Sequence, residues 1–197
     1  MAQITRERII KHAIECMALN GNTGLDEIAG AAGVGRATLY RHFKSRADLI
    51  SEIKLAAGEE LQAVVTPIME SELLAREKLV NIVCKLVPLG ASLNVSAYFD
   101  HPVKEVEPRV KASYLRHLAQ ARTLAQALKD EGAVSPEIPL VWLVASLDSL
   151  IFCAWEKVES GDIAPKQAPW LLIRTFLAGH GTPETLAWLK KQEEVNQ

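Results

Sequence analysis

Cysteine is scarce in this 197-residue chain, and there is only one long apolar run. Cys16, Cys84 and Cys153 lie far apart, without the Cys-x-x-Cys or Cys/His spacing of a zinc site. We therefore expect buried thiols in a reducing cytosol rather than a redox switch, and no metal or other cofactor. The apolar run, residues 138–155, is short for a bilayer and contains Asp148 near its centre, so it predicts a buried helix and no membrane span.

Targeting and catalytic signals are also missing from the sequence. The N-terminus is polar and lacks the apolar core of a signal peptide, so we expect a cytoplasmic protein. The five histidines are scattered without metal-ligand spacing. The chain has neither a phosphate-binding glycine loop nor a nucleophile motif. These absences argue against an enzyme.

The periodicity of the chain predicts helices throughout. Ala, Leu, Glu, Lys and Arg dominate, few residues favour strands, and nearly every segment has an apolar period near 3.6. With 49% hydrophobic residues, the chain is long enough to bury a substantial core. We therefore predict an all-α protein. Helices are expected over residues 5–20 with Thr5 as N-cap, 25–32, 36–43, 46–66 stopped by Pro67, 71–87, 92–99, 108–131, 136–158, 166–179 and from 183 onward.

The most informative stretch of the sequence is residues 25–43. An apolar stripe at helical spacing precedes Gly33, and glycine takes the positive φ of a helix end without steric cost. A second short helix follows, in which Ala37, Leu39 and Phe43 are expected to face the core while polar residues occupy the other faces. This pattern predicts a helix-turn-helix that reads DNA.

This stretch contains several short motifs at fixed distances from one another. They are Ile28-Ala29, Ala32-Gly33-Val34 and Thr38-Leu39-Tyr40-Arg41-His42-Phe43, followed by a basic residue at 46. They resemble the TetR family of transcriptional regulators, over roughly the first quarter of the chain. Gly24 stands where members usually carry Ser or Thr, and Arg46 where Lys is commonest. The resemblance implies an N-terminal three-helix DNA-binding domain at 1–47 and a larger helical effector-binding and dimerisation domain at 48–197.

The charge of the chain is split in the same way. Residues 1–47 hold seven Lys/Arg and four Asp/Glu, a net +3, so the remaining residues carry −5 of the total of −2. A basic head on an acidic body agrees with a DNA-reading domain fused to a second domain, although a difference of this size cannot establish it alone.

The second helix of the motif supplies the candidate DNA contacts. Arg36 at its start can pair with O6 and N7 of guanine, and the Thr38 hydroxyl can meet a base or a phosphate. Arg41 can do either. The resemblance implies phosphate contacts for Tyr40, His42 and Arg46, with Thr23 and Lys44 as further candidates. The expected contacts to an operator of double-stranded DNA are Thr23, Arg36, Thr38, Tyr40, Arg41, His42, Lys44 and Arg46.

Candidate effector-binding residues combine aromatic walls with a few polar groups, as small-molecule pockets do. Asp148 is a carboxylate in an apolar run, so it is expected to meet a cationic ligand, His117 or an arginine across a dimer, or to face solvent at the helix edge. For each aromatic residue, core packing is the alternative. The candidates are Tyr98, Phe99, Tyr114, His117, Trp142, Asp148 and Phe152.

Helices expected at 136–158 and 166–179 are apolar on more than one face, so they must be buried or paired. The family often dimerises through its last two major helices, and the chain's own core is the alternative for each residue. The resulting hypothesis is a homodimeric repressor that a small molecule releases from DNA. A helical adaptor that binds another protein is the alternative function. The interface candidates are Trp155, Val158, Trp170, Ile173, Phe176 and Leu177.

Overall fold

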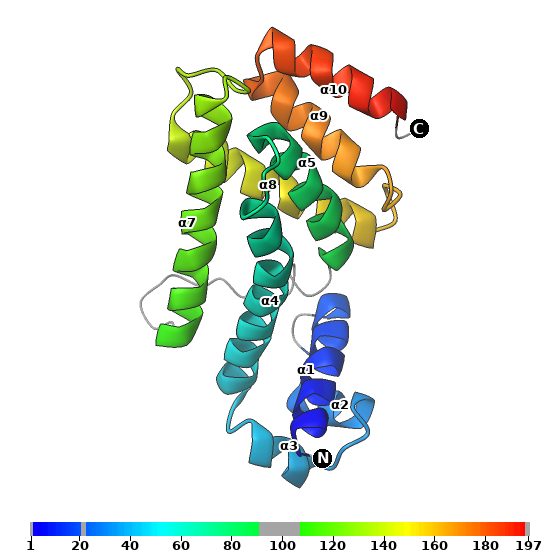
Figure 1. Ribbon diagram of the computed structural model, residues 1–197. Coiled ribbons are helices and arrows are strands. Elements are labelled where there is room, and N and C mark those ends of the chain that lie inside the picture. The colour runs from blue at the N-terminus through cyan, green and yellow to red at the C-terminus, as the bar shows by residue number, and fades with distance from the viewer. Residues whose placement is uncertain (1, 21–22, 91–106, 196–197) are drawn as a thin grey trace. The chain divides into compact units, whose positions relative to one another are not determined.

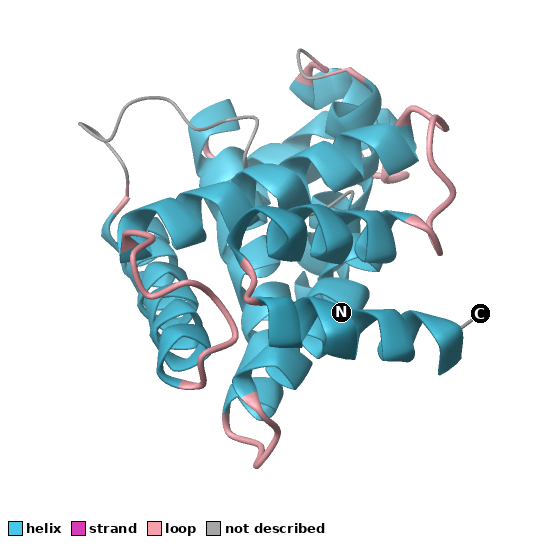
Figure 2. Cartoon of the chain, turned by 90° about the horizontal axis from the view of Figure 1, so that it is seen from above, coloured by secondary structure: helices cyan, strands magenta, loops and turns pink. Residues whose placement is uncertain are grey.

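The structure, a computed structural model, describes residues 2–20, 23–90 and 107–195, and helices joined by short loops make up most of them (Figure 1). No strand occurs among them, which confirms the predicted all-α class (Figure 2). Val134 and Gly181 form an isolated antiparallel bridge. The elements are α1 (Ala2–Leu19), α2 (Leu25–Ala31), α3 (Arg36–His42), α4 (Arg46–Met69), α5 (Ala75–Leu86), the 3-10 turn η1 (Val87–Leu89), α7 (Pro108–Asp130), α8 (Leu140–Glu159), α9 (Ala168–His180) and α10 (Pro183–Val195).

Two compact units divide the described residues. The first unit contains residues up to 60 together with 107–114, and the second contains 61–90 and 115–195. Helices α4 and α7 therefore each contribute residues to both units. The expected functional boundary at residues 47 and 48 stays a prediction, because compactness follows packing and not function.

The core of the first unit is built from apolar faces of α1 to α4. Helix α2 packs on both α1 and α3, which lie together in Figure 1. Because a seven-residue helix cannot stand alone in water, α2 and α3 depend on this shared core. The buried cluster comprises Ile9, Ile10, Ala13, Met17, Ile28, Ala29, Ala32, Leu39, Phe43, Leu49 and Ile53.

Helix α9 is central to the second unit, where it packs on α5, α8 and α10. Leu172, Ile173, Phe176 and Leu177 are all at most 4% exposed, so they occupy two faces of α9. This explains the apolar character of the helix, since neighbours cover it on several sides.

Several helix boundaries differ from the predicted ones. Helix α1 begins at Ala2, so Thr5 is not its N-cap, because the preceding residues contain no helix breaker. Helix α4 continues past Pro67 to Met69, since proline removes one hydrogen bond in what is already the last turn. Helix α5 begins at Ala75. The residue before it, Leu74, donates its backbone N–H to the Glu77 carboxylate at 3.0 Å. The predicted helix at 92–99 lies outside the described residues.

The start of α8 also falls later than predicted. The helix was expected to begin at residue 136, but the backbone N–H of Ser135 donates to the carbonyl of His180 at 2.9 Å. That bond ties the segment to the end of α9, and α8 begins only after Pro139. Pro108 does begin α7 and Pro183 begins α10, as predicted from the preference of proline for a first helical turn.

Candidate DNA-binding interface and effector site

The turn between α2 and α3 depends on Gly33, whose φ is +62°. Its N–H donates to Gly30 at 3.0 Å and the next N–H, of Val34, donates to Ala29 at 2.9 Å. These bonds satisfy carbonyls at the end of α2 and turn the chain toward α3. The predicted glycine turn is therefore confirmed.

Replacing Gly33 with alanine is expected to cost about 1–2 kcal/mol of stability, because a Cβ is disfavoured at positive φ. Gly30→Ala is the matched control: Gly30 has no positive φ, lies inside α2, and a Cβ there meets nothing within 4 Å. It should gain about 0.5–1 kcal/mol. Urea unfolding followed by circular dichroism measures both, and equal shifts would contradict the assigned turn geometry.

Leu39 and Phe43 fix the orientation of α3. Both side chains are fully buried and lie about one turn apart, so the rest of the helix faces outward. Arg36, Tyr40 and Arg41 are exposed. Ala37 was predicted to be buried but is exposed, because it lies two residues, about 200° of helix rotation, from Leu39. Thr38 is partly exposed on the outward side.

An ion pair joins the start of α3 to α2. The Nε of Arg36 lies 2.5 Å from Oδ1 of Asp26, and the two side chains are 70% and 53% exposed. Sequence reasoning had named Arg36 without a partner. The link was hidden because ten residues and a turn separate the two.

Thr23 does not face a DNA surface. Its side chain is buried, and its hydroxyl donates to the carbonyls of Asn20 at 2.6 Å and Cys16 at 3.1 Å. The hydroxyl thus satisfies carbonyls at the end of α1, which corrects its predicted role as a phosphate contact. The guanidinium of Arg46 donates to the carbonyl of Thr23, so it holds this loop against the start of α4. A phosphate contact by Arg46 stays a prediction.

The remaining two basic candidates differ in exposure. Lys44 is exposed, and the chain passes directly from it to Ser45, the N-cap of α4, whose Oγ accepts the Asp48 N–H at 3.1 Å. This hydrogen bond caps the first turn of α4. His42 is half-buried, and its buried Nε2 has no hydrogen-bond partner among the described residues. A phosphate would therefore have to meet Nδ1 of this ring.

Glu52 of α4 was not singled out from the sequence. It is 8% exposed, accepts a hydrogen bond from Arg109 of α7 at 2.8 Å and pairs with Arg6 of α1. Burial raises the pKa of this carboxyl, but the two arginines outweigh burial and hold the pKa below its ordinary value. Both arginines belong, with Glu52, to the first unit. The one feature of the sequence that pointed to a buried carboxylate is the position of Glu52 directly before Ile53, a residue of the core.

The described effector candidates differ in exposure, and the structure brings two of them, His117 and Asp148, together. Tyr98 and Phe99 lie outside the described residues. Tyr114 is 57% exposed on α7, and Phe152 is 40% exposed on α8. His117 Nε2 and Asp148 Oδ1 lie 3.7 Å apart, so of the partners considered for Asp148 the structure supplies the histidine. A role for any of them in effector binding stays a prediction.

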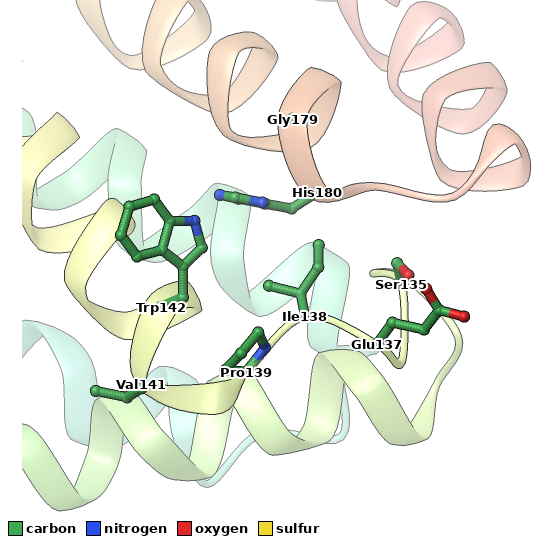
Figure 3. A pocket seen from close by; sticks show the side chains of 8 residues that line it. All are labelled: Ser135, Glu137, Ile138, Pro139, Val141, Trp142, Gly179 and His180. Carbon is green, nitrogen blue, oxygen red and sulfur yellow. The ribbon is translucent and has the colours of Figure 1, made fainter.

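Trp142 lines an open cavity of about 580 Å³ at the start of α8 and the end of α9 (Figure 3). The ring of His180 extends toward the indole of Trp142 in Figure 3. Nε2 of His180 lies 3.0 Å from Oγ of Ser146, which helps to fix the ring. The lining residues are Ser135, Glu137, Ile138, Pro139, Val141, Trp142, Gly179 and His180.

Four of the predicted interface residues belong to the core of the chain instead. Ile173, Phe176 and Leu177 are at most 1% exposed, and Trp155 is 5% exposed with its Nε1 donating to the Leu86 carbonyl at 3.2 Å. A side chain with almost no exposed surface has little left to bury against a partner. Only Val158 and Trp170 of that set retain partial exposure, and their interface role stays a prediction.

A different apolar surface is exposed on α8 and α9. Val141 is 70% exposed, Trp142 60% and Phe152 40% on α8, and Leu171 is 43% exposed on α9. Val141 and Phe152 are eleven residues apart, about three helical turns, and so share one face. We define the exposed apolar surface as Val141, Trp142, Phe152 and Leu171. Sequence reasoning missed two of its members because periodicity cannot tell which of two apolar faces the core uses.

The cysteines are unpaired in the structure. Cys16 and Cys84 are half-buried, and burial raises the pKa of both thiols. Cys153 is exposed, contrary to the expected burial, because it follows Phe152 on the outer side of α8. Across the described residues, no group of three His, Cys, Asp or Glu side chains could hold a metal ion, and no helix is long and apolar enough to cross a membrane.

Comparisons with known proteins agree with this geometry. Residues 9–53 match the family model described as bacterial regulatory proteins, tetR family. The HTH-type transcriptional regulator AcrR of Shigella flexneri is 48% identical over 54 residues, which are 26% of this chain and 25% of AcrR. The chain thus matches about a quarter of the length of that relative.

Solved structures resemble the chain over most of its length. The TetR-like regulator LfrR from Mycobacterium smegmatis, in complex with proflavine, has a TM-score of 0.73 at 22% identity, over 90% of this chain and 97% of LfrR. The ketosteroid regulator KstR2 of Mycobacterium tuberculosis has a TM-score of 0.74 at 18% identity, over 90% and 95%. A gamma-butyrolactone receptor (ArpA-like protein) has 0.71 at 19% identity, over 100% and 98%.

The glycine turn, the two buried anchors of α3 and its outward polar face define a helix-turn-helix protein. The helices that follow have the fold of the solved regulators. Residues 9–53 thus form a helix-turn-helix domain similar to that of the tetR family of bacterial regulatory proteins.

Proposed function

We propose that this protein is a transcriptional repressor that binds an operator through α3 and releases it when a small molecule binds the second unit. One observation carries the DNA-binding part: Leu39 and Phe43 anchor α3 so that Arg36, Tyr40 and Arg41 all face outward. An α-helix fits the major groove, where the base pairs are distinguishable by their edges. Arg36 at the N-terminal end is in the position from which recognition helices contact bases.

The other basic and polar groups divide by what they can reach. Thr38, Tyr40, Arg41 and Lys44 have exposed surface beside Arg36, and we assign them to phosphates or base edges. Phosphate contacts set the register of a protein on DNA, while base contacts set its sequence preference. Thr23 is excluded from this set because its hydroxyl is already hydrogen-bonded to carbonyls at the end of α1.

Selection from a library of random 20-base-pair duplexes tests the proposed function. The full-length protein is expected to enrich one sequence with two related half-sites, because a dimer presents two copies of α3 about one DNA turn apart. Recovery of no preferred sequence at any salt concentration would contradict a specific DNA-binding role.

The effector part of the proposal is supported by similar structures. LfrR is described in complex with proflavine, and another similar structure is described as a gamma-butyrolactone receptor. We infer that this chain also binds a small organic molecule, with His117 and Asp148 as polar candidates. Such a ligand would act by favouring a conformation that fits the operator poorly. A thermal-shift screen followed by operator-binding assays tests it, and a screen in which no stabilising compound alters operator affinity would argue for a constitutive repressor.

The exposed apolar surface supports a homodimer. Val141, Trp142, Phe152 and Leu171 expose large apolar groups, and such surfaces mark interaction sites. The same surface is the one observation that favours the alternative function, a helical adaptor for another protein. Specific DNA enrichment distinguishes the repressor from the adaptor.

Phe152→Glu is expected to convert the dimer into a monomer, because a carboxylate would be buried against the partner without a cation. Light scattering after gel filtration should then give a mass near 21.6 kDa, that of one chain. Tyr114→Glu is the control, since Tyr114 is an even more exposed aromatic outside the exposed apolar surface. A dimeric Phe152→Glu protein would place the interface elsewhere.

A further inference from the structure

Asp26 presents a carboxylate beside the first residue of the recognition helix. Its Oδ1 lies 2.5 Å from the Nε of Arg36, and both side chains are more than half exposed. We propose that Asp26 is a positioning residue: it holds the Arg36 guanidinium for one base pair and thereby sharpens the sequence preference of the protein. The inference rests on the proposed DNA-binding function and adds a specificity-determining residue on α2, outside the recognition helix.

The chemistry of the guanidinium supports this role. An arginine has five N–H donors, one on Nε and four on the two terminal nitrogens. Asp26 occupies the Nε position, which leaves the terminal nitrogens for another partner. Guanine offers two acceptors, O6 and N7, that match a pair of guanidinium N–H groups. The ion pair therefore restricts a flexible side chain without using the donors that a base needs.

Electrostatics gives the carboxylate a second effect. An exposed negative charge close to DNA is repelled by phosphates, and it lowers affinity for any sequence. Without Asp26, the Arg36 side chain could turn to a phosphate as readily as to a base, because both accept hydrogen bonds from a guanidinium. Asp26 partly neutralises Arg36 and so favours contacts in which geometry, rather than net charge, decides the partner. We therefore expect Asp26 to weaken non-specific DNA binding and to strengthen discrimination between base pairs.

Glu27 provides a matched comparison in the same turn of α2. It is also exposed, but its Oε2 accepts the backbone N–H of Gly24 at 3.3 Å and so acts on the helix end. Glutamine can take the same capping position. Glu27→Gln and Asp26→Asn thus each remove one negative charge from α2, while only the second alters the partner of Arg36.

The test is the base preference of the full-length protein, measured by sequencing after selection from random 20-base-pair duplexes. Asp26→Asn is expected to reduce the preference at the base pair read by Arg36 by about two- to fivefold, the range of an exposed ion pair. Asp26→Glu should retain most of the preference. Glu27→Gln should leave it unchanged, while both charge-removing variants bind random DNA more tightly. In an Arg36→Ala background, Asp26→Asn should have no further effect on the base preference, although it should still tighten binding to random DNA.

Two results would overturn the inference while leaving the repressor proposal intact. In the first, the wild-type protein enriches a sequence and Asp26→Asn gives the same base profile. In the second, Glu27→Gln changes the base profile in the same way as Asp26→Asn. The change would then come from the loss of one negative charge and not from the partner of Arg36. If the wild-type protein enriches no sequence, the proposed function and the inference fail together. Thermal unfolding of each variant confirms that a changed profile does not come from an unfolded head.

Discussion

Replacing both Arg6 and Arg109 with methionine is expected to destabilise the first unit by about 3 kcal/mol at neutral pH. The double variant leaves the Glu52 carboxylate, only 8% exposed, without the two cations that now contact it. Methionine keeps the apolar stem of each arginine, including that of Arg6, whose guanidinium lies 5.4 Å from the Phe43 ring centroid. The loss therefore reports mainly the unpaired charge.

Glu52→Gln is the matched control for this pair of substitutions. It removes the buried charge, and the side chains of Arg6 and Arg109, 38% and 62% exposed, can remain in water. Its expected cost is about 1 kcal/mol, that of ordinary hydrogen bonds. Urea unfolding at pH 7 measures both, and a larger loss in Glu52→Gln than in the double variant would contradict the argument.

The pH dependence gives a second measure of the same site. The pKa of Glu52 is lowered in the folded protein, so its contribution is complete above the ordinary carboxyl pKa, about 4.3, and is lost as pH falls through the lowered value. In the double variant burial acts alone and raises the pKa of Glu52, so the penalty disappears on acidification. The difference between wild type and variant should shrink from pH 7 to pH 4, and an unchanged difference would contradict it.

Arg36→Ala is expected to remove about 1–3 kcal/mol of discrimination at one base pair of each half-site, because a bidentate arginine–guanine contact is lost. Arg36 is 70% exposed, so its removal should leave the stability of the head nearly unchanged. Base preferences from selected sequences measure the effect. A variant with the wild-type profile would show that another residue reads the bases.

Lys44→Ala is the control for Arg36→Ala. Lys44 is exposed beyond the end of α3 and is assigned to phosphate. Its removal should weaken binding to all sequences alike and reduce the slope of log affinity against log salt by about one. Two variants that each lose one positive charge would thus separate base reading from phosphate binding.

The helix-turn-helix was predictable because its signals are local. Gly33 reports a backbone conformation that a side chain disfavours, and Leu39 and Phe43 report the buried side of a short helix through their spacing. Pro108 and Pro183 likewise mark helix starts through their own fixed φ. Each of these inferences needed only residues within about one or two turns of each other.

The second unit was harder to predict, because α8 and α9 are apolar on more than one face. Periodicity identified the helices, but it could not decide between a partner and the chain's own core for Ile173, Phe176 and Leu177, which lie in that core. Thr23 failed for a related reason: a hydroxyl that can reach a phosphate can equally satisfy carbonyls of the preceding helix, as it does here.

The sequence by itself determined the all-α class, the glycine turn and the two buried anchors of α3, Leu39 and Phe43. Only the tertiary structure decided the partners: Asp26 for Arg36, Arg6 and Arg109 for Glu52, and His117 for Asp148. The physical reason is distance along the chain. Backbone preference and helical spacing are properties of neighbouring residues, whereas the pairing of charges depends on which segments the packed core brings together.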